Sequence, residues 1–390
     1  MGLKTRCGTG VHRSVLAELE EEEGVLRLWR TGAEAPVLQY ALKYWPRGRR
    51  PTQLASNGPG TLLAVGSGEG DVLVLRLGTE AWGQAVEEVE VSGLETQQQG
   101  GLVHLAWHPL SAQDTHLVTL TRGGRVQVLD VNGAARQEDE DARYQLDAET
   151  AVEQTLHLTA TARGGARAAF SSDGWRALAF PGTEDAVPGA PWTSLSMFAV
   201  RESGEVSVLC PVLPGRCRLP QSRVVAPLRA QAAGAVDGAG RQQGAWLRAL
   251  EGRARVLAHA SGATDWLVVE GAQGLPAFAH VAARAQGPLP VAPEPLEARA
   301  ASGQYLLEEL SGCWAVQGRL VRAFHSGRVD VLALAGAVAP QWQPVRGAPC
   351  AGPGAARVGA RGGGPGAGGP GAGAGAWAGG CGAGSLIGPL

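Results

Sequence analysis

The chain has 390 residues, a net charge of −2 and an apolar content of 44%, which is enough for a core. It contains no long basic run, so the electrostatic footprint of nucleic-acid binding is missing and we expect no direct nucleic-acid partner. No apolar run approaches the roughly 20 residues of a membrane helix, the first residues lack an apolar signal-peptide core, and six scattered cysteines are typical of a reduced intracellular protein.

The repeated element of the chain is a short strand that starts after a glycine. The pattern Gly-x-Val-x-Val-Leu begins at four glycines, with a shifted version at a fifth and a degraded version at a sixth: Gly70, Gly124, Gly204 and Gly327, then Gly24 and Gly274. Alternation with period 2 buries one face of a hairpin, and glycine accepts the positive φ of its turn. We therefore expect the four glycines of the intact pattern to terminate hairpins.

The spacing of these glycines predicts the architecture. In chain order the six glycines are separated by 46, 54, 80, 70 and 53 residues, and propeller blades repeat at about 40–50 residues. The 80-residue interval has room for one more blade, and residues 166–180 supply a further hairpin with a turn at Asp173-Gly174. We predict an all-β fold, a seven-bladed β-propeller over residues 1–345, with six blades as the alternative count.

A β-sandwich followed by a second all-β domain is the competing architecture. Sandwiches do not force the same hairpin to recur at a near-fixed period, so the repeat favours the propeller. The most complete unit is residues 101–131, which hold three short apolar runs separated by a polar loop and a Gly-Gly bend. We expect Trp107 to pack between sheets and four valines to face the core between blades: Val126, Val128, Val206 and Val208.

The composition changes at about Arg346 to Gly, Ala and Pro. Such a segment cannot bury enough apolar surface to offset the entropy of ordering it, so we predict a disordered tail over residues 346–390. Read-through of a gene prediction is the alternative origin of this tail.

The histidines and cysteines do not indicate a metal site. His104 and His108 lie four residues apart in an expected strand, which would separate their Cβ atoms by roughly 13 Å, and His116 follows only after a loop. Cys210 and Cys217 could form half of a zinc site, but no second pair at ligand spacing follows them and zinc usually takes four ligands. A loop closed by prolines is the better interpretation of this pair.

Other candidate motifs also have structural explanations. Gly66–Gly70 is glycine-rich like a phosphate loop, but a strand follows it where a helix is needed, which indicates a hairpin turn. The acidic runs 20–23 and 138–141 are expected to be solvated loops, with docking of a basic partner as the alternative. No Gly-x-Ser-x-Gly elbow and no Ser/His/Asp set emerges from the sequence. We predict that the protein is not an enzyme, with no catalytic, cofactor-binding or metal residues and no cofactor.

Three stretches resemble one divergent propeller family. In residues 102–131, Ala106-Trp107-His108-Pro109 leads through Asp114-Thr115-His116 to Leu120-Thr121. Residues 62–83 are similar to the preceding blade of that family, and residues 194–215 to a strand hairpin that runs into Leu-Cys-Pro-Val-x-Pro. The three stretches keep their order and spacing, and they resemble the nucleoporin 88 family in its plant-type form.

The resemblance implies a non-enzymatic scaffold on the cytoplasmic face of the nuclear pore complex, which supports messenger-RNA export and nucleocytoplasmic protein transport. The implied partners are other nucleoporins: the autoproteolytic domain of a Gly-Leu-Phe-Gly-repeat nucleoporin and the helical tail of a Phe-Gly nucleoporin. No membrane insertion is expected. The family's C-terminal coiled coil has no counterpart in this sequence, and the matched motifs carry over no partner-contacting residue.

Two other classes of function stay open at this point. A generic adaptor propeller, for instance a substrate receptor of a ubiquitin ligase, would use the same fold to bind proteins. A propeller hydrolase or lyase would need convergent polar residues at the inner strand ends that line the central channel.

Overall fold

The computed structural model describes residues 3–7, 15–20, 25–30, 34–36, 38–77, 86–132, 136–137, 144–158, 174–181, 190–234, 238–258, 265–271, 281–287, 289, 297–299, 305–307, 310–316, 319–333, 338 and 340–344. The chain divides into two units, Met1–Ala348 and Pro349–Leu390, and every described residue lies in the first. The predicted tail therefore lies outside the described residues, and its boundary at residue 346 stays a prediction.

Five sheets follow one another along the chain. The first holds β1 (Leu3–Cys7), β2 (Val15–Glu20), β3 (Val25–Arg30) and β4 (Leu38–Ala41). The second is built on β5 (Pro51–Ser56), β6 (Leu62–Ser67), β7 (Val72–Leu77) and β8 (Val86–Ser92). The third holds β9 (Leu102–Trp107), β10 (His116–Thr121), β11 (Arg125–Asp130) and β14 (Val152–His157). The fourth holds β15 (Trp175–Ala179), β16 (Met197–Arg201) and β17 (Val206–Leu209), and the fifth β24 (Leu310–Val316), β25 (Arg319–Phe324) and β26 (Val329–Ala333).

The first strand of each sheet lies against the first strand of the next. β1 contacts β5, β5 contacts β9, β9 contacts β15 and β15 contacts β24, each from the edge of its own sheet. Sheets that pack face to face and meet at their first strands are the blades of a β-propeller. The predicted propeller is therefore confirmed, while the number of blades stays a prediction.

The middle sheets are buried on both faces. Every residue of β6 and β10 is buried, so each of these strands has a neighbouring sheet on either side. Val126 and Val128 lie in the core between the third and fourth sheets, and Val206 and Val208 lie in the core that the fourth sheet shares with the fifth. All four valines are fully buried. Trp107 packs between the second and third sheets, where its indole N–H donates to a carbonyl of β5 at 2.9 Å. These predicted positions are confirmed.

The four repeat glycines terminate hairpins, as predicted. Gly70, Gly124, Gly204 and Gly327 have φ angles of +109°, +89°, +85° and +89° and precede β7, β11, β17 and β26. The glycine-rich stretch 66–70 is accordingly the end of β6 and its turn, and β7 follows it. Gly24 and Gly274 lie outside the described residues.

The described part of the 80-residue interval adds strands to neighbouring sheets and forms no sheet of its own. β12 (Arg136–Gln137) and β13 (Tyr144–Asp147) extend the second sheet, where β13 runs parallel to β8. A single turn, α1 (Ala148–Ala151), then leads into β14 of the third sheet. β15 is the second arm of the hairpin expected over residues 166–180, but it pairs with β16 in the fourth sheet. Residues 166–173 lie outside the described residues.

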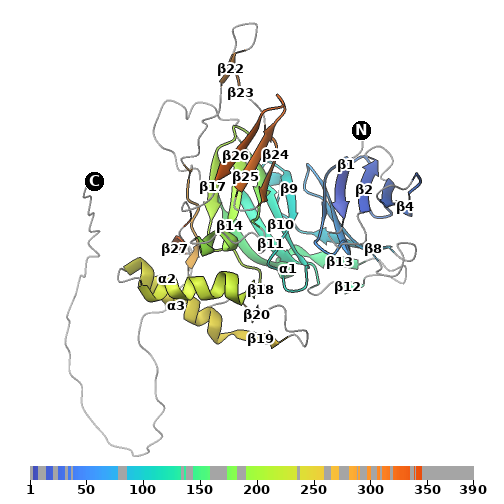
Figure 1. The fold of residues 1–390 in the computed structure, drawn as a ribbon. Helices are drawn as coiled ribbons and strands as arrows, with labels where there is room; N and C mark the ends of the chain where they lie inside the picture. Colours follow the sequence, from blue (N-terminus) through green and yellow to red (C-terminus); the bar gives the residue numbers. More distant parts are fainter. Residues whose placement is uncertain are drawn as a thin grey trace, which may run out of the picture. The chain divides into compact units, whose positions relative to one another are not determined.

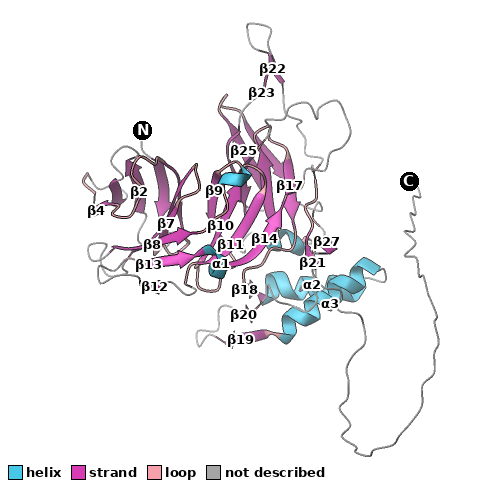
Figure 2. Ribbon diagram, turned by 180° about the vertical axis from the view of Figure 1, so that it is seen from behind, coloured by secondary structure: helices cyan, strands magenta, loops and turns pink. Residues whose placement is uncertain are grey.

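A helical insertion separates the fourth and fifth sheets, and the all-β prediction missed it. A π-helical turn (Gln221–Val225) leads into α2 (Ala226–Gly234) and α3 (Gly238–Gly252), beside a sheet of β18 (Arg216–Pro220), β20 (Asp265–Glu270) and β19 (Ala254–Ala258) (Figures 1 and 2). Trp246 of α3 packs against Trp192 with their ring centroids 5.2 Å apart, and Leu250 is fully buried in the same core. Apolar packing therefore fixes the helices to the fourth sheet.

Two 3-10 helices, Gln97–Gln99 and Pro191–Leu195, and four short strands complete the described secondary structure. The strands form two antiparallel pairs, β21 (Val281–Ala283) with β27 (Trp342–Pro344), and β22 (Glu297–Arg299) with β23 (Tyr305–Leu307).

We expect Val128→Asp to unfold the propeller. Val128 has no exposed surface, and a buried unpaired charge costs several kcal/mol, on the order of the whole stability margin. Val331→Asp is the matched control, because Val331 of β26 is 54% exposed and the same charge there should leave the midpoint of thermal unfolding nearly unchanged. Circular dichroism on heating measures both variants. A Val128→Asp chain with the wild-type midpoint would contradict the blade assignment.

A second pair of variants tests how closely the second and third sheets approach each other. Gly101 and Gly48 both have positive φ, +82° and +78°. A Cβ at Gly101 would lie 2.2 Å from the carbonyl oxygen of Gly68, whereas a Cβ at Gly48 would meet nothing within 4 Å. Gly48→Ala should therefore lower the free energy of unfolding only by the backbone strain, about 1–3 kcal/mol. Gly101→Ala should lower it clearly more, as measured by urea unfolding. Equal losses would show that the close approach contributes nothing.

Candidate functional site

The loop between β9 and β10, residues 108–115, joins the third sheet to the helical insertion. The N–H of Ala112 donates to the carbonyl of Arg216 at 3.0 Å, and the N–H of Arg218 donates to the carbonyl of Leu110 at 2.8 Å. Ser111, which lies between Leu110 and Ala112 in the loop, forms an isolated antiparallel bridge with Cys217. The loop thus acts as an additional short strand beside β18, and the position of the insertion depends on it.

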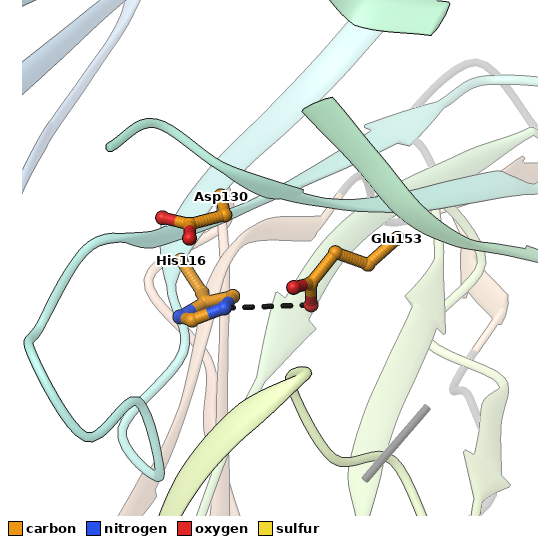
Figure 3. Close-up of side chains that lie close together, drawn as sticks. All are labelled: His116, Asp130 and Glu153. Atoms are coloured by element: carbon orange, nitrogen blue, oxygen red, sulfur yellow. Dashed lines mark ion pairs between the residues drawn. The ribbon is translucent and has the colours of Figure 1, made fainter. Parts of the chain in front are cut away.

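A buried polar cluster lies where this loop enters β10. His116, the first residue of β10, pairs in register with Asp130 at the end of β11. Glu153 belongs to β14, whose register shifts so that Leu129 pairs with Val152 and Val128 with Gln154, leaving Glu153 without an opposite residue. Such a β-bulge re-aims a side chain, and it brings the carboxylate of Glu153 beside His116 and Asp130 (Figure 3).

Polar contacts surround the members of the cluster. Nδ1 of His116 lies 2.7 Å from Oγ of Ser111, and Nε2 of the same ring lies 3.4 Å from Oε2 of Glu153. The hydroxyl of Thr115 donates to Oδ1 of Asp130 at 2.9 Å. The side chain of His116 is 2% exposed, so the imidazole is closed off from solvent.

Ser111, His116 and Glu153 have the order of groups found in Ser-His-acid hydrolases, a set that did not emerge from the sequence. A nucleophilic hydroxyl must reach a substrate carbonyl, but Ser111 has no exposed surface. Its oxygen also accepts the N–H group of Thr115 at 3.0 Å and lies 3.4 Å from the N–H of His116. The set therefore holds the loop in shape and offers no nucleophile.

Asp114 connects the tip of the loop to β18. Its φ of +57° is the sole positive φ of a non-glycine residue in the described part of the chain. Arg218 donates from Nη2 to Oδ1 of Asp114 at 2.9 Å, and Asn57 of the second sheet donates to its backbone carbonyl at 3.1 Å. Burial raises the pKa of Asp114, and the nearby Arg218 guanidinium opposes that rise. One residue thus contacts the second sheet, the third sheet and the insertion.

The segment after β17 closes the cluster from the other side. The peptide bond before Pro211 is cis, and Val212 and Leu213 are buried. The N–H of Gly215 donates to Oε2 of Glu153 at 2.5 Å, and the amide of Gln154 donates to the carbonyl of Leu213 at 3.0 Å. Three stretches that carry much of the resemblance described above therefore meet beside β18: residues 106–109, 114–116 and 209–214. We call this meeting place, with the loop 108–115, the buried cluster and β18, the junction.

His108, Cys210 and Cys217 are candidates from the sequence, and all three are buried. His108 follows the end of β9 instead of lying within it, and its Nδ1 accepts the N–H of Leu110 at 3.2 Å. Burial, with a smaller contribution from His116, lowers the pKa of His108 to about 3, so this ring is neutral. Cys210 and Cys217 are free and buried, and burial raises the pKa of each thiol to about 12. Neither cysteine joins a group of metal-ligating side chains among the described residues.

The acidic runs are only partly described. Glu20 ends β2 and pairs with Arg27 at 2.7 Å, whereas residues 21–23 and 138–141 lie outside the described residues. Within the described ranges the helices are too short or too polar to cross a membrane.

Comparison with known proteins gives a family match for part of the chain. Residues 95–253 match the family described as Nucleoporin NUP82 beta-propeller, and this segment contains the third and fourth sheets, the junction and both helices of the insertion. No curated protein matches the chain. The fold is a β-propeller, and residues 95–253 are similar to the Nup82 nucleoporin propeller family, in agreement with the resemblance stated from residues 62–215.

Two solved structures are similar to the chain. One is the Nup82 N-terminal domain of Chaetomium thermophilum, solved in a heterotrimer with the Nup159 tail and the Nup145N autoproteolytic domain. It matches with a TM-score of 0.62 and 20% identity over 88% of this chain and 69% of that chain. The other is the yeast heterotrimeric Nup82-Nup159-Nup116 complex, with a TM-score of 0.47 and 13% identity over 83% of this chain and 68% of that chain. The first likeness supports the propeller fold.

Substitutions at Asp114 test the junction. Asn adopts positive φ and keeps a side-chain oxygen for Arg218, whereas Ala is strained there and offers no acceptor. We expect Asp114→Ala to lower the free energy of unfolding by about 1–3 kcal/mol, and Asp114→Asn by clearly less, in urea titrations of the full chain. Arg218→Met on top of Asp114→Ala should cost only the contact of the Arg218 guanidinium with the Trp266 ring, whose centroid lies 5.6 Å away, because the ion pair is already lost. Equal losses for Ala and Asn would argue against strain at this position.

Proposed function

We propose that this chain is a structural nucleoporin at the cytoplasmic face of the nuclear pore complex, where it acts as a scaffold for messenger-RNA export and nucleocytoplasmic protein transport. The match of residues 95–253 to the Nup82 propeller family carries this proposal. The geometry of the described residues agrees with it. A propeller with a rigidly attached helical insertion presents surface for other proteins, and its buried Ser-His-Glu set is out of reach of a substrate.

The proposed partners are other nucleoporins. In the similar fungal structure, a Nup82 N-terminal domain assembles with a Nup159 tail and a Nup145N autoproteolytic domain. By analogy, we assign to this chain the autoproteolytic domain of a Gly-Leu-Phe-Gly-repeat nucleoporin and the helical tail of a Phe-Gly nucleoporin. Binding of this kind needs shape and charge complementarity and no catalysis, so the proposed role is non-enzymatic.

Localisation and affinity purification of a tagged, endogenously expressed full-length protein test the proposal. We expect enrichment at the nuclear rim and recovery of nucleoporins by mass spectrometry, including one with an autoproteolytic domain. The Val331→Asp variant, which should fold, serves as the folded control, and Val128→Asp should lose both the rim signal and the partners. Diffuse staining with recovery of ubiquitin-ligase subunits and no pore proteins would replace the nucleoporin role with that of a generic adaptor.

A further inference from the structure

His116, Asp130 and Glu153 come from three adjacent strands of the third sheet and converge on one point (Figure 3). One nitrogen of His116 and one oxygen of each carboxylate all lie within 4.8 Å of one another. The distance from Nε2 of His116 to Oε2 of Glu153 is 3.4 Å. Two ligand atoms bound tetrahedrally to Zn²⁺ at its usual N and O distances lie about 3.3 Å apart, so this spacing already fits.

Nε2 of His116 has no hydrogen-bond partner although its side chain is 98% buried (2% exposed). A buried imidazole nitrogen normally pays for its desolvation with a hydrogen bond or a metal. This nitrogen faces the carboxylate of Glu153, and the other ring nitrogen is already engaged by Ser111 (Figure 3). The orphaned atom is therefore aimed into the centre of the cluster.

The charges of the cluster also call for a cation. Asp130 and Glu153 are both partly buried, and the side chain of Glu153 is 17% exposed. Among the described residues no lysine or arginine forms an ion pair with either carboxylate, and His116 is the one basic partner, facing Glu153. Two carboxylates this close repel each other at low dielectric, and a divalent cation between them removes that repulsion.

We propose that His116, Asp130 and Glu153 bind a zinc ion, a role that goes beyond the proposed scaffold function. The donor set of one imidazole and two carboxylates suits Zn²⁺, and three protein ligands leave the fourth position to a water molecule. In the bound form Nδ1–H of His116 donates to Ser111, which frees the Nε2 lone pair for the metal.

Other contacts orient the ligands as metal sites require. Asp130 accepts from the hydroxyl of Thr115 at 2.9 Å and from the N–H of Asn132 at 3.0 Å. Glu153 accepts from the N–H of Gly215 at 2.5 Å. Outer contacts of this kind fix the geometry of the ligands. A bound zinc ion would clamp β10, β11 and the bulge of β14, and through Gly215 it would also secure the segment that closes the junction.

Zinc content and thermal unfolding of the purified full-length chain test this site. After removal of metal with EDTA, incubation with ZnCl₂ and dialysis, we expect the wild type to retain one zinc ion per chain more than Glu153→Gln or Asp130→Asn. Zinc should raise the midpoint of unfolding of the wild type by at least about 2 °C and leave both variants unchanged. Glu149→Gln is the matched control, because Glu149 is an exposed carboxylate on α1 outside the cluster, and it should behave as wild type.

Cobalt substitution of the wild type covers the case in which the variants do not fold. Co²⁺ in a site of N and O ligands gives the visible bands of a four-coordinate ion without sulfur-to-metal charge transfer, which is the expected spectrum. Charge-transfer bands would assign the metal to cysteines and overturn the proposal. Equal zinc contents in all four chains would overturn it as well. A third result would also overturn the proposal: the wild type has the same midpoint of unfolding in zinc and in EDTA, and Glu153→Gln has a lower midpoint in both conditions. The cluster would then be an ion pair only.

Discussion

Burial of the sheets on both faces is the constraint on which the rest of the structure depends. β6 and β10 are buried at every position, so neither strand can keep its apolar side chains from water unless a sheet packs on each side. Successive cores between the sheets supply this cover, and their valines and leucines alternate from one face to the other. A blade of this chain therefore has no stable form by itself, and the sheets are expected to fold together.

The same constraint traps polar groups within the strands, where they must find partners inside the protein. Arg322 of β25 has no exposed surface, and it pairs with Asp330 at 2.8 Å and donates to the carbonyl of Gly204 in the β16–β17 turn. Glu88 is buried as well and accepts from Tyr40 at 2.8 Å and from two backbone N–H groups of the segment between the first and second sheets. Arg322 and Glu88 each reach a neighbouring sheet or connection, and these contacts help to specify how the blades stack.

The sequence was informative where the cause of the structure is local. Glycine at the turn and alternating valines depend on two or three neighbouring residues, so Gly124 and Val128 could be assigned from the pattern alone. The junction depends on residues far apart in the chain: Arg218 reaches Asp114 across 104 positions. Glu153 joins the cluster only because a bulge shifts its register, and no periodicity reveals a bulge. Helix α3 did leave a signal, since Trp246, Leu247 and Leu250 repeat with helical spacing, but the surrounding glycines obscured it.

The motifs that carry the resemblance are the ones that build the junction. Trp107 closes the space between two sheets, Asp114 joins the loop to β18, and the segment from Cys210 to Gly215 closes over Glu153. Asp114 and the segment from Cys210 to Gly215 attach β18 and the chain that leads into it to the third sheet. A scaffold has to present its partners at fixed positions, and an insertion on flexible ends would lose binding energy to the cost of ordering it. Two carbonyl hydrogen bonds, an ion pair and a buried imidazole hold this insertion before any partner arrives. In this protein the polar chemistry of the propeller therefore provides rigidity.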